Sequence, residues 1–227
     1  MMEPAPATVE QITTRLAEVR QRIDAARSPD QEVSIVAVTK TFGPELIEHA
    51  VAAGLTVLGE NYAQELVAKA ETLTQRSPDV AEQIRWHFIG GLQSNKIKMM
   101  GDLVTVWQTV DRRSLAKELA KRRPGASLLI QVNTTDEAQK SGCAPADVGA
   151  LVDDARGRGL DVRGLMTIGP TDGSDPRPAF DALRHLGSEH GLPELSMGMS
   201  GDYEIAVRQG ATMVRIGSAL FGPRDRR

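Results

Sequence analysis

Short apolar runs alternate with helical apolar stripes along nearly the whole chain. The first stripe spaces its apolar residues three and four apart and predicts one helix ahead of every strand: Val9, Ile12, Leu16, Val19 and Ile23. The run VSIVAVTK at 33–40 follows, and its β-branched, nearly continuous apolar character is typical of a strand buried on both faces. A unit then recurs, in which a helix ends at a glycine and a β-rich run follows; these glycines are Gly54, Gly159, Gly191 and Gly210.

Counting the β-rich runs gives eight predicted strands. They begin near residues 33, 55, 84, 103, 126, 160, 192 and 211, and helical patterns separate most of them. We therefore predict an α/β fold, a single (β/α)8 TIM barrel with an extra N-terminal helix. One domain then spans 1–227, and we expect residues 1–7 and 223–227 to fray. A doubly wound open sheet is the alternative, but the first βα turn, TKTFGPE, lacks the G-x-G-x-x-G pattern of dinucleotide-binding folds.

The composition excludes several classes of function. A net charge of −3 gives no reason to expect a nucleic acid or an anionic membrane as partner. No apolar run exceeds four residues, whereas a membrane-spanning helix needs roughly twenty. The start, MMEPAPATVE, has neither a basic region nor an apolar core, so we expect no signal peptide. The single cysteine, Cys143, allows no intrachain disulfide, and we expect a reducing, cytoplasmic location.

Lys40 is the strongest candidate for a reactive residue. The active face of such a barrel lies where the strands end, and Lys40 closes the apolar run of the first strand. Burying an ammonium group is costly and lowers its pKa, and a neutral amine at a barrel mouth is what a Schiff base with an aldehyde requires. A lysine that extends to solvent, or one paired with Glu60, is the alternative.

The ends of the seventh and eighth predicted strands form a second group of candidate binding residues. MGMSGD at 197–202 and RIGSALFG at 215–222 each combine glycines with a hydroxyl group. Backbone N–H groups at such turns bind phosphate, and the loops after these two strands are the usual phosphate site of the fold. Ordinary turn chemistry is the alternative for each motif alone, but their pairing, with Lys40 on the first strand, favours phosphate binding.

Arg215 is predicted to project into the barrel, on the same side as Met213. A buried arginine needs a partner, which would be either a ring nitrogen of a bound cofactor or an Asp or Glu of a neighbouring strand.

The other reactive residue types give weaker signals. His87, on an apolar strand, is expected to be a hydrogen-bonded core histidine, and Cys143 has no evident histidine partner and is expected to be inert. No cysteine or carboxylate completes a metal site with His185 and His190, so we predict no metal.

The order of motifs resembles a known family. In sequence they are VAVTK-T, GENYAQE, WHFIG-x-LQSNK, VN-x3-E-x2-KSG, GLMTI, LSMGMS-x-D and VRIGSALFG. Together they resemble the pyridoxal phosphate homeostasis proteins, whose barrel is similar to the N-terminal domain of bacterial alanine racemase. The resemblance runs from about residue 9 to Gly222.

The resemblance implies a (β/α)8 barrel that binds pyridoxal 5′-phosphate (PLP) covalently. It implies Lys40 as the Schiff-base lysine, Arg215 facing the pyridine nitrogen, and Asn61 lining the ring pocket. The implied phosphate ligands are Ser200, Gly217 and Ser218, and no catalytic residue is implied. The sequence departs from the family pattern at Thr39, Gly91 and Ser218, where Ser, Pro and Thr respectively are more usual.

The residue chemistry favours a carrier over a catalyst. An arginine beside the pyridine nitrogen disfavours its protonation and weakens the ring as an electron sink. A racemase also needs an acid/base on the opposite ring face, whereas Tyr62 and Tyr203 are the only tyrosines and fall at helix starts. The chain ends five residues after Gly222, which we expect to leave no room for a second domain.

We therefore expect a monomeric PLP protein that buffers PLP or delivers it to apoenzymes, with effects on amino-acid and keto-acid balance. A PLP-dependent amino-acid racemase or lyase of weak activity is the alternative. A barrel enzyme acting on another sugar phosphate, with Lys40 binding the phosphate, is a more distant one.

Overall fold

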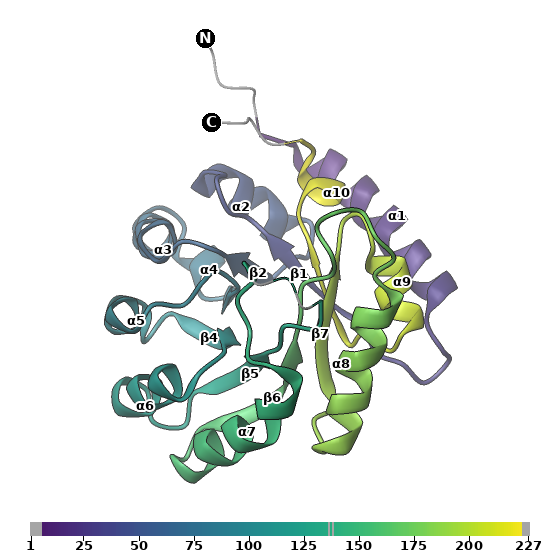
Figure 1. Cartoon of the computed structure of the whole chain (residues 1–227). Coiled ribbons are helices and arrows are strands. Elements are labelled where there is room, and N and C mark those ends of the chain that lie inside the picture. The colour runs from purple at the N-terminus through teal and green to yellow at the C-terminus, as the bar shows by residue number, and fades with distance from the viewer. Residues whose placement is uncertain (1–5, 136, 138, 224–227) are drawn as a thin grey trace.

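A computed structural model of the chain describes residues 6–135, 137 and 139–223. Its strands close into one parallel barrel in chain order, with the first strand paired to the eighth (Figure 1). The strands are β1 Ser34–Val38, β2 Val57–Glu60, β3 Arg85–Phe88, β4 Val104–Val110, β5 Ser127–Gln131, β6 Asp161–Met166, β7 Glu194–Met199 and β8 Met213–Ile216. Every strand begins within two residues of its predicted start, so the barrel is confirmed and the doubly wound sheet is wrong.

The barrel wall separates two apolar regions. Alternate strand residues face opposite sides, so one set packs against the helices and the other fills the barrel. Trp107 and Leu128 belong to the large core shared with the helices. Val106, Leu129 and Met166 form a separate small cluster, as expected for residues one step out of phase that face the barrel interior.

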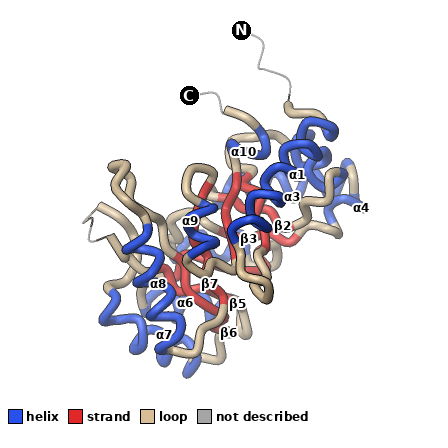
Figure 2. Tube along the Cα trace, turned by 90° about the vertical axis from the view of Figure 1, so that its right-hand side faces the viewer, coloured by secondary structure: helices blue, strands red, loops and turns tan. Residues whose placement is uncertain are grey.

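Helices surround the barrel on its outer side (Figure 2). They are α1 Val9–Ala26, α2 Pro44–Ala52, α3 Ala63–Arg76, α4 Pro78–Ala81, α5 Ser94–Met100, α6 Arg113–Arg122, the 3-10 turn η1 Pro145–Asp147, α7 Val148–Gly157, α8 Arg177–Glu189, α9 Tyr203–Arg208 and α10 Ser218–Phe221. The four glycines predicted to end helices all have positive φ, as a left-handed C-terminal residue requires. In the described part of the chain, no helix is both long enough and apolar enough to span a bilayer.

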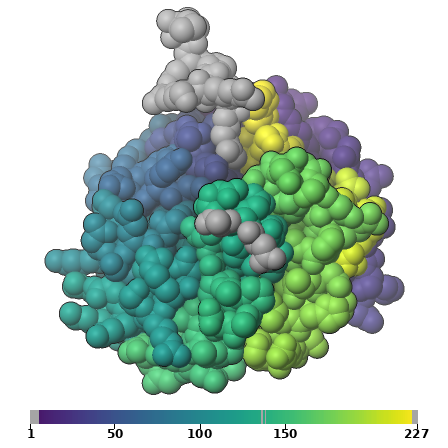
Figure 3. All heavy atoms as spheres, viewed as in Figure 1, coloured from purple at the N-terminus to yellow at the C-terminus, as the bar shows by residue number. Residues whose placement is uncertain are grey.

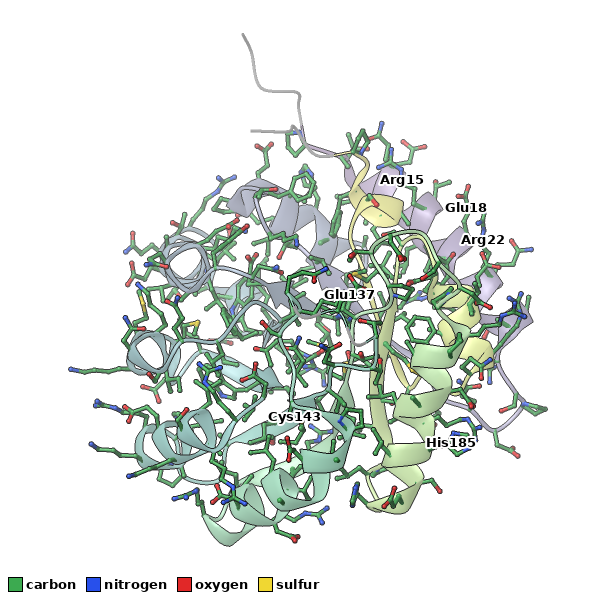
Figure 4. The ribbon with its side chains drawn as sticks, in the orientation of Figure 1. Arg15, Glu18, Arg22, Glu137, Cys143 and His185 are labelled. Carbon is green, nitrogen blue, oxygen red and sulfur yellow. The ribbon has the colours of Figure 1, made fainter. Side chains whose placement is uncertain are left out.

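The extra N-terminal helix, α1, packs against the outside of the barrel beside α9 and α10. Thr8 and Gln11 form a reciprocal capping box at its start, which satisfies N–H groups that a helix leaves unpaired. Arg15 donates to the Leu220 carbonyl oxygen at 3.2 Å, and Arg22 pairs with Glu204 of α9 at 3.4 Å. Arg15 and Arg22 lie in one row along α1 (Figure 4).

Fraying was predicted for residues 1–7 and 223–227. Of these, residues 1–5 and 224–227 lie outside the described residues. Ala7, in contrast, is buried, and its carbonyl oxygen lies 2.9 Å from His49 Nδ1 on α2. The chain is therefore held in place from the residue before the Thr8 cap onward.

Candidate functional site

The carboxyl ends of β1, β2 and β8 bring three of the predicted site residues to one edge. Val38 is in register with Gly59 of β2, so Lys40 and Asn61 lie at the same height on neighbouring strand ends. Ala37 is in register with Ile216 of β8, which sets Gly217 on the other side of Lys40. This is the face on which such barrels bind their ligands.

Ser200 and the start of α10 form a cluster of hydrogen-bond donors at the same edge. The Ser200 Oγ accepts from the backbone N–H groups of Gly217 and Ala219, each at 3.3 Å. Two amides that converge on one oxygen, with a hydroxyl beside them, are a donor set suited to a phosphate oxygen. Ser218, between those amides, is exposed.

Gly198 on β7 gives Ser200 its position. The register of β7 against β8 shifts between Ser196 and Met199, and Gly198 has a φ of +90°. A Cβ at Gly198 would lie 2.5 Å from the Ala206 Cβ of α9. The bulged strand end therefore requires glycine here, as is common beside functional sites.

Arg215 projects into the barrel, as its phase predicted. Its Nη1 donates to the carbonyl oxygen and Oγ of Ser196, both at 2.9 Å, and its Nη2 donates to the Thr167 carbonyl oxygen at 2.8 Å. Within the described residues these acceptors are uncharged, so the predicted alternative of an Asp or Glu ion-pair partner finds no counterpart there. Burial lowers the pKa of Arg215 to about 10, although the nearby Asp202 carboxylate opposes the shift.

A polar path continues from Ser196 across the barrel to His87. Ser196 Oγ donates to Gln108 Oε1 at 2.7 Å, and Gln108 Nε2 lies 2.8 Å from His87 Nδ1. Burial lowers the pKa of His87 to about 4, and the Arg163 and Arg85 charges add to the effect. His87 is therefore the hydrogen-bonded core histidine that was predicted, neutral at physiological pH, with Nδ1 as the acceptor.

Asn61 lies where β2 ends and is braced by the neighbouring turn. Its Oδ1 is buried and has no hydrogen-bond partner in the described structure. Gly90, after β3, approaches so closely that a Cβ there would lie 1.9 Å from the Asn61 carbonyl oxygen. An orphaned buried acceptor at a strand end is the kind of atom that a bound molecule satisfies.

Glu60, the predicted alternative partner of Lys40, is bonded to Thr39 and to Lys69, and the sequence did not single out Lys69. Its Oε1 accepts from Lys69 Nζ and from Thr39 Oγ1, both at 2.7 Å. Burial raises the pKa of Glu60, and the Lys69 ammonium opposes that rise. Lys69 interrupts the apolar face of α3, between Leu66 and Leu73, which is the signal that could have revealed the pair.

The segment after β5 lies over the centre of the carboxyl face, where Figure 3 shows it in the foreground and Figure 4 labels Glu137. Lys140 Nζ is 2.6 Å from Glu137 Oε1 and 2.6 Å from the Gly169 carbonyl oxygen. Thr171 Oγ1 donates to Glu137 Oε2 at 2.9 Å. The loops after β5 and β6 are thus tied together above the barrel mouth.

Cys143 pairs with Val132 just after β5, across the barrel from Lys40, and is half-buried (Figure 4). Burial, with the Asp111 and Asp147 carboxylates, raises its pKa to about 12, so the thiolate is scarce at neutral pH. Within the described residues, no cluster of three or more His, Cys, Asp or Glu side chains could hold a metal ion.

A cavity of about 840 Å3 opens at the opposite end of the barrel, between α1 and the starts of β1 and β2. Arg20, Asp24 and Arg85 are among its lining residues, and none of the predicted site residues reaches it. Because ligands of this fold bind at the carboxyl face, the cavity is not the candidate site.

A lysine and a set of oxyanion donors at the carboxyl edge of a parallel barrel are typical of a (β/α)8 protein that binds a phosphorylated ligand. Comparison with known families agrees with this class. Residues 9–225 match the family described as alanine racemase, N-terminal domain. Among curated proteins, the chain is 40% identical to a pyridoxal phosphate homeostasis protein of Vibrio alginolyticus, over 99% of both chains. It is also 40% identical to one of Pseudomonas aeruginosa, over 95% of both chains.

A solved structure agrees with these relatives. The structure of PipY of Synechococcus elongatus with PLP bound is 32% identical and superposes with a TM-score of 0.78, over 93% of this chain and all of PipY. Its structure without PLP gives 33% and 0.81. The chain belongs to the pyridoxal phosphate homeostasis protein family, which has the alanine racemase N-terminal fold.

Proposed function

We propose that this chain binds PLP at the carboxyl edge of its barrel and serves in intracellular PLP homeostasis, buffering the cofactor or delivering it to apoenzymes. Lys40 is the lysine that holds the cofactor covalently. Ser200, Gly217 and Ser218 bind its phosphate, Asn61 lines the ring pocket, and Arg215 faces the pyridine nitrogen. The names of the relatives and the PLP-bound PipY structure support this function.

The observation that carries the proposal is the pair of amides on Ser200 Oγ, one strand away from Lys40. A phosphorylated aldehyde needs an oxyanion site and an amine within one ligand's reach, and neighbouring strand ends supply both. The buried Oδ1 of Asn61, which has no hydrogen-bond partner among the described residues, adds an acceptor on the other side of Lys40. The residues present therefore fit PLP.

Arg215 supports a carrier more than a catalyst. PLP, when bound, would supply an aldehyde for the lysine amine and a ring that withdraws electrons most strongly when its nitrogen is protonated. A guanidinium has N–H donors and no acceptor, so it binds an unprotonated ring nitrogen. With a pKa of about 10, Arg215 stays charged at pH 7 and keeps that nitrogen an acceptor.

Neither tyrosine offers a clear second acid/base. Tyr203 is buried, and burial raises the pKa of its hydroxyl, while Arg22 of α1, on the outside of the barrel, opposes that rise. Tyr62, at the start of α3, is 55% exposed and therefore does not build a wall that would exclude water. A site in which neither tyrosine serves as the second acid/base suits storage and transfer of PLP.

The test is covalent capture. Purified protein mixed with PLP should absorb in the visible range, and borohydride should fix one adduct that peptide mass analysis maps to Lys40. Lys40→Ala should abolish the adduct, while Lys121→Ala, a change of an exposed lysine on α6, should retain it. A chain that takes up no PLP would overturn the proposal.

A second assay separates a carrier from a racemase or lyase. The PLP-loaded chain should reactivate an apo-aminotransferase, and Lys40→Ala should not. Incubation with L- and D-amino acids in deuterium oxide should leave Cα unlabelled. Catalytic exchange at Cα would instead establish the enzyme alternative.

A further inference from the structure

A buried ionic cluster lies directly behind the strand end that carries Lys40. It consists of Glu60 at the end of β2 and of Glu65 and Lys69 on α3. The Lys69 Nζ donates to Glu60 Oε1 at 2.7 Å and to Glu65 Oε1 at 2.6 Å. The side chain of Glu60 is completely buried, that of Lys69 is 5% exposed, and the proposed binding chemistry uses neither.

The cluster bonds to the residues on both sides of Lys40. The Thr39 carbonyl oxygen accepts from Lys69 Nζ at 2.8 Å, and Thr39 Oγ1 donates to Glu60. The Thr41 N–H donates to Glu65 Oε1 at 2.5 Å. All three protons of the Lys69 ammonium thus have acceptors, one of which is the peptide group that joins Thr39 to Lys40.

The backbone after Lys40 adopts a conformation that needs such support. Among the described residues other than glycine, only Thr41 has a positive φ, at +70°. For a β-branched residue this region is strongly disfavoured and persists only where the surroundings impose it. The charged acceptor on the Thr41 N–H is such a constraint.

The cluster lies on the outer side of the barrel wall. A Cβ at Gly59 would lie 2.9 Å from Val36 Cγ1, so both are on one side, and that side is the interior because Ala37 and Leu58 belong to the core shared with the helices. Thr39 and Glu60 are out of phase with these residues and meet α3 on the outer side. The cluster therefore bonds to the backbone on both sides of Lys40, at the Thr39 carbonyl oxygen and the Thr41 N–H.

We propose that Glu60, Glu65 and Lys69 are positioning residues that fix the peptide groups on both sides of Lys40 and so present its amine to the aldehyde of PLP. This inference rests on the proposed function. In the step concerned, the Lys40 nitrogen bonds to the aldehyde carbon and one molecule of water leaves. Fixing the amine beforehand removes an orientational cost from that bimolecular step.

The sharpest test compares three variants of the same helix. Glu65→Leu removes the acceptor for the Thr41 N–H, whereas Glu65→Gln keeps a side-chain oxygen there. Glu71→Leu makes the same change at an exposed position of α3 and is the matched control. Glu65→Leu should slow covalent PLP attachment about tenfold, Glu65→Gln should remain within about threefold of wild type, and Glu71→Leu should not change the rate.

Hydrogen exchange in the chain without PLP gives the second readout. Peptides covering 39–42 should exchange faster in Glu65→Leu, while peptides of β5 and α7 stay unchanged. Glu60→Gln should have the same local effect, because it weakens the bonds to Thr39 and Lys69. Circular dichroism at the assay temperature establishes that each variant is folded.

The outcomes separate the positioning role from the proposed function. A wild-type attachment rate in Glu65→Leu, or unchanged exchange at 39–42, would overturn the positioning role and leave PLP binding intact. Faster exchange throughout the chain would also overturn it, since the residues would then be supporting the whole fold. If wild-type protein attaches no PLP, the proposed function fails, and exchange at 39–42 alone decides the positioning role.

Discussion

Polar side chains inside the barrel form one hydrogen-bonded path from β3 to β8. His87, Gln108, Ser196 and Arg215 follow one another at hydrogen-bonding distance, and Thr167 accepts at the far end. Buried polar groups are costly only when unpaired, so this path can replace apolar packing at small net cost. It also fixes the direction of the Arg215 guanidinium below the site.

His87 should make stability depend on pH. Its pKa is about 4 in the folded chain, against 6.5 for a histidine free of the fold, so the folded state favours the neutral ring. The stabilisation that the neutral His87 ring gives the folded state is complete above pH 6.5 and is lost as the pH falls toward 4. Over that window wild type should lose about 3 kcal/mol more unfolding free energy than His87→Asn does.

Urea unfolding between pH 7 and 4 measures this difference. His87→Asn retains an oxygen able to accept from Gln108 but cannot take up a proton. His185→Asn, on the exposed side of α8, is the matched control (Figure 4). Parallel curves for wild type and His87→Asn would contradict the assignment.

At the scale of the elements, glycines let the turns after the strands approach one another. The turn after β3 contacts the end of β2 through Gly90, and the bulge in β7 depends on Gly198. Both contacts lie beside site residues, Asn61 and Ser200. The geometry of the site is therefore set partly by residues that contribute no side chain to it.

Gly90→Ala tests this dependence. Its Cβ would lie 1.9 Å from the Asn61 carbonyl oxygen, so the turn must shift. We expect a loss of about 1–3 kcal/mol in unfolding free energy, together with weaker PLP binding. Gly91→Ala is the matched control, because its Cβ meets nothing within 4 Å, and it should change stability by less than about 0.5 kcal/mol. Equal thermal midpoints for the two variants would show that the contact does not matter.

At the scale of the molecule, the site exists only because the barrel closes. Lys40 follows the first strand and Ser200 and Gly217 follow the last two, yet the pairing of β1 with β8 makes Lys40 and Gly217 neighbours. A ligand that contacts all three residues bridges the seam where the sheet meets itself. Its binding should oppose opening of the barrel there.

PLP should therefore raise the thermal midpoint. At about one hundred times its dissociation constant, a ligand adds about 2.7 kcal/mol, which for a chain of this size corresponds to roughly 5–10 °C. Calorimetric scans with increasing PLP should follow that dependence in wild type and show a much smaller rise in Lys40→Ala. An unchanged wild-type midpoint at saturating PLP would argue against binding at the seam.

The sequence by itself determined the strand order, the strand starts and the edge to which the candidate residues belong. The signals for these are local. Apolar runs and their glycine stops set where β1 and β8 begin, and chain order alone puts Lys40 and Gly217 at the ends of their strands. The inward direction of Arg215 followed from the two-residue period of a strand.

Only the tertiary structure decided which polar groups meet. Glu60 pairs with Lys69, and Arg215 bonds to Ser196 and the Thr167 carbonyl oxygen, neither of which the sequence pattern indicated. Such choices depend on strand register, on a bulge in β7 and on which helix face covers which strand. A hydrogen bond is lost when its partners move apart by about 1 Å, whereas hydrophobic burial persists over such a displacement. The sequence could therefore predict which residues are buried but not which polar groups bond to one another.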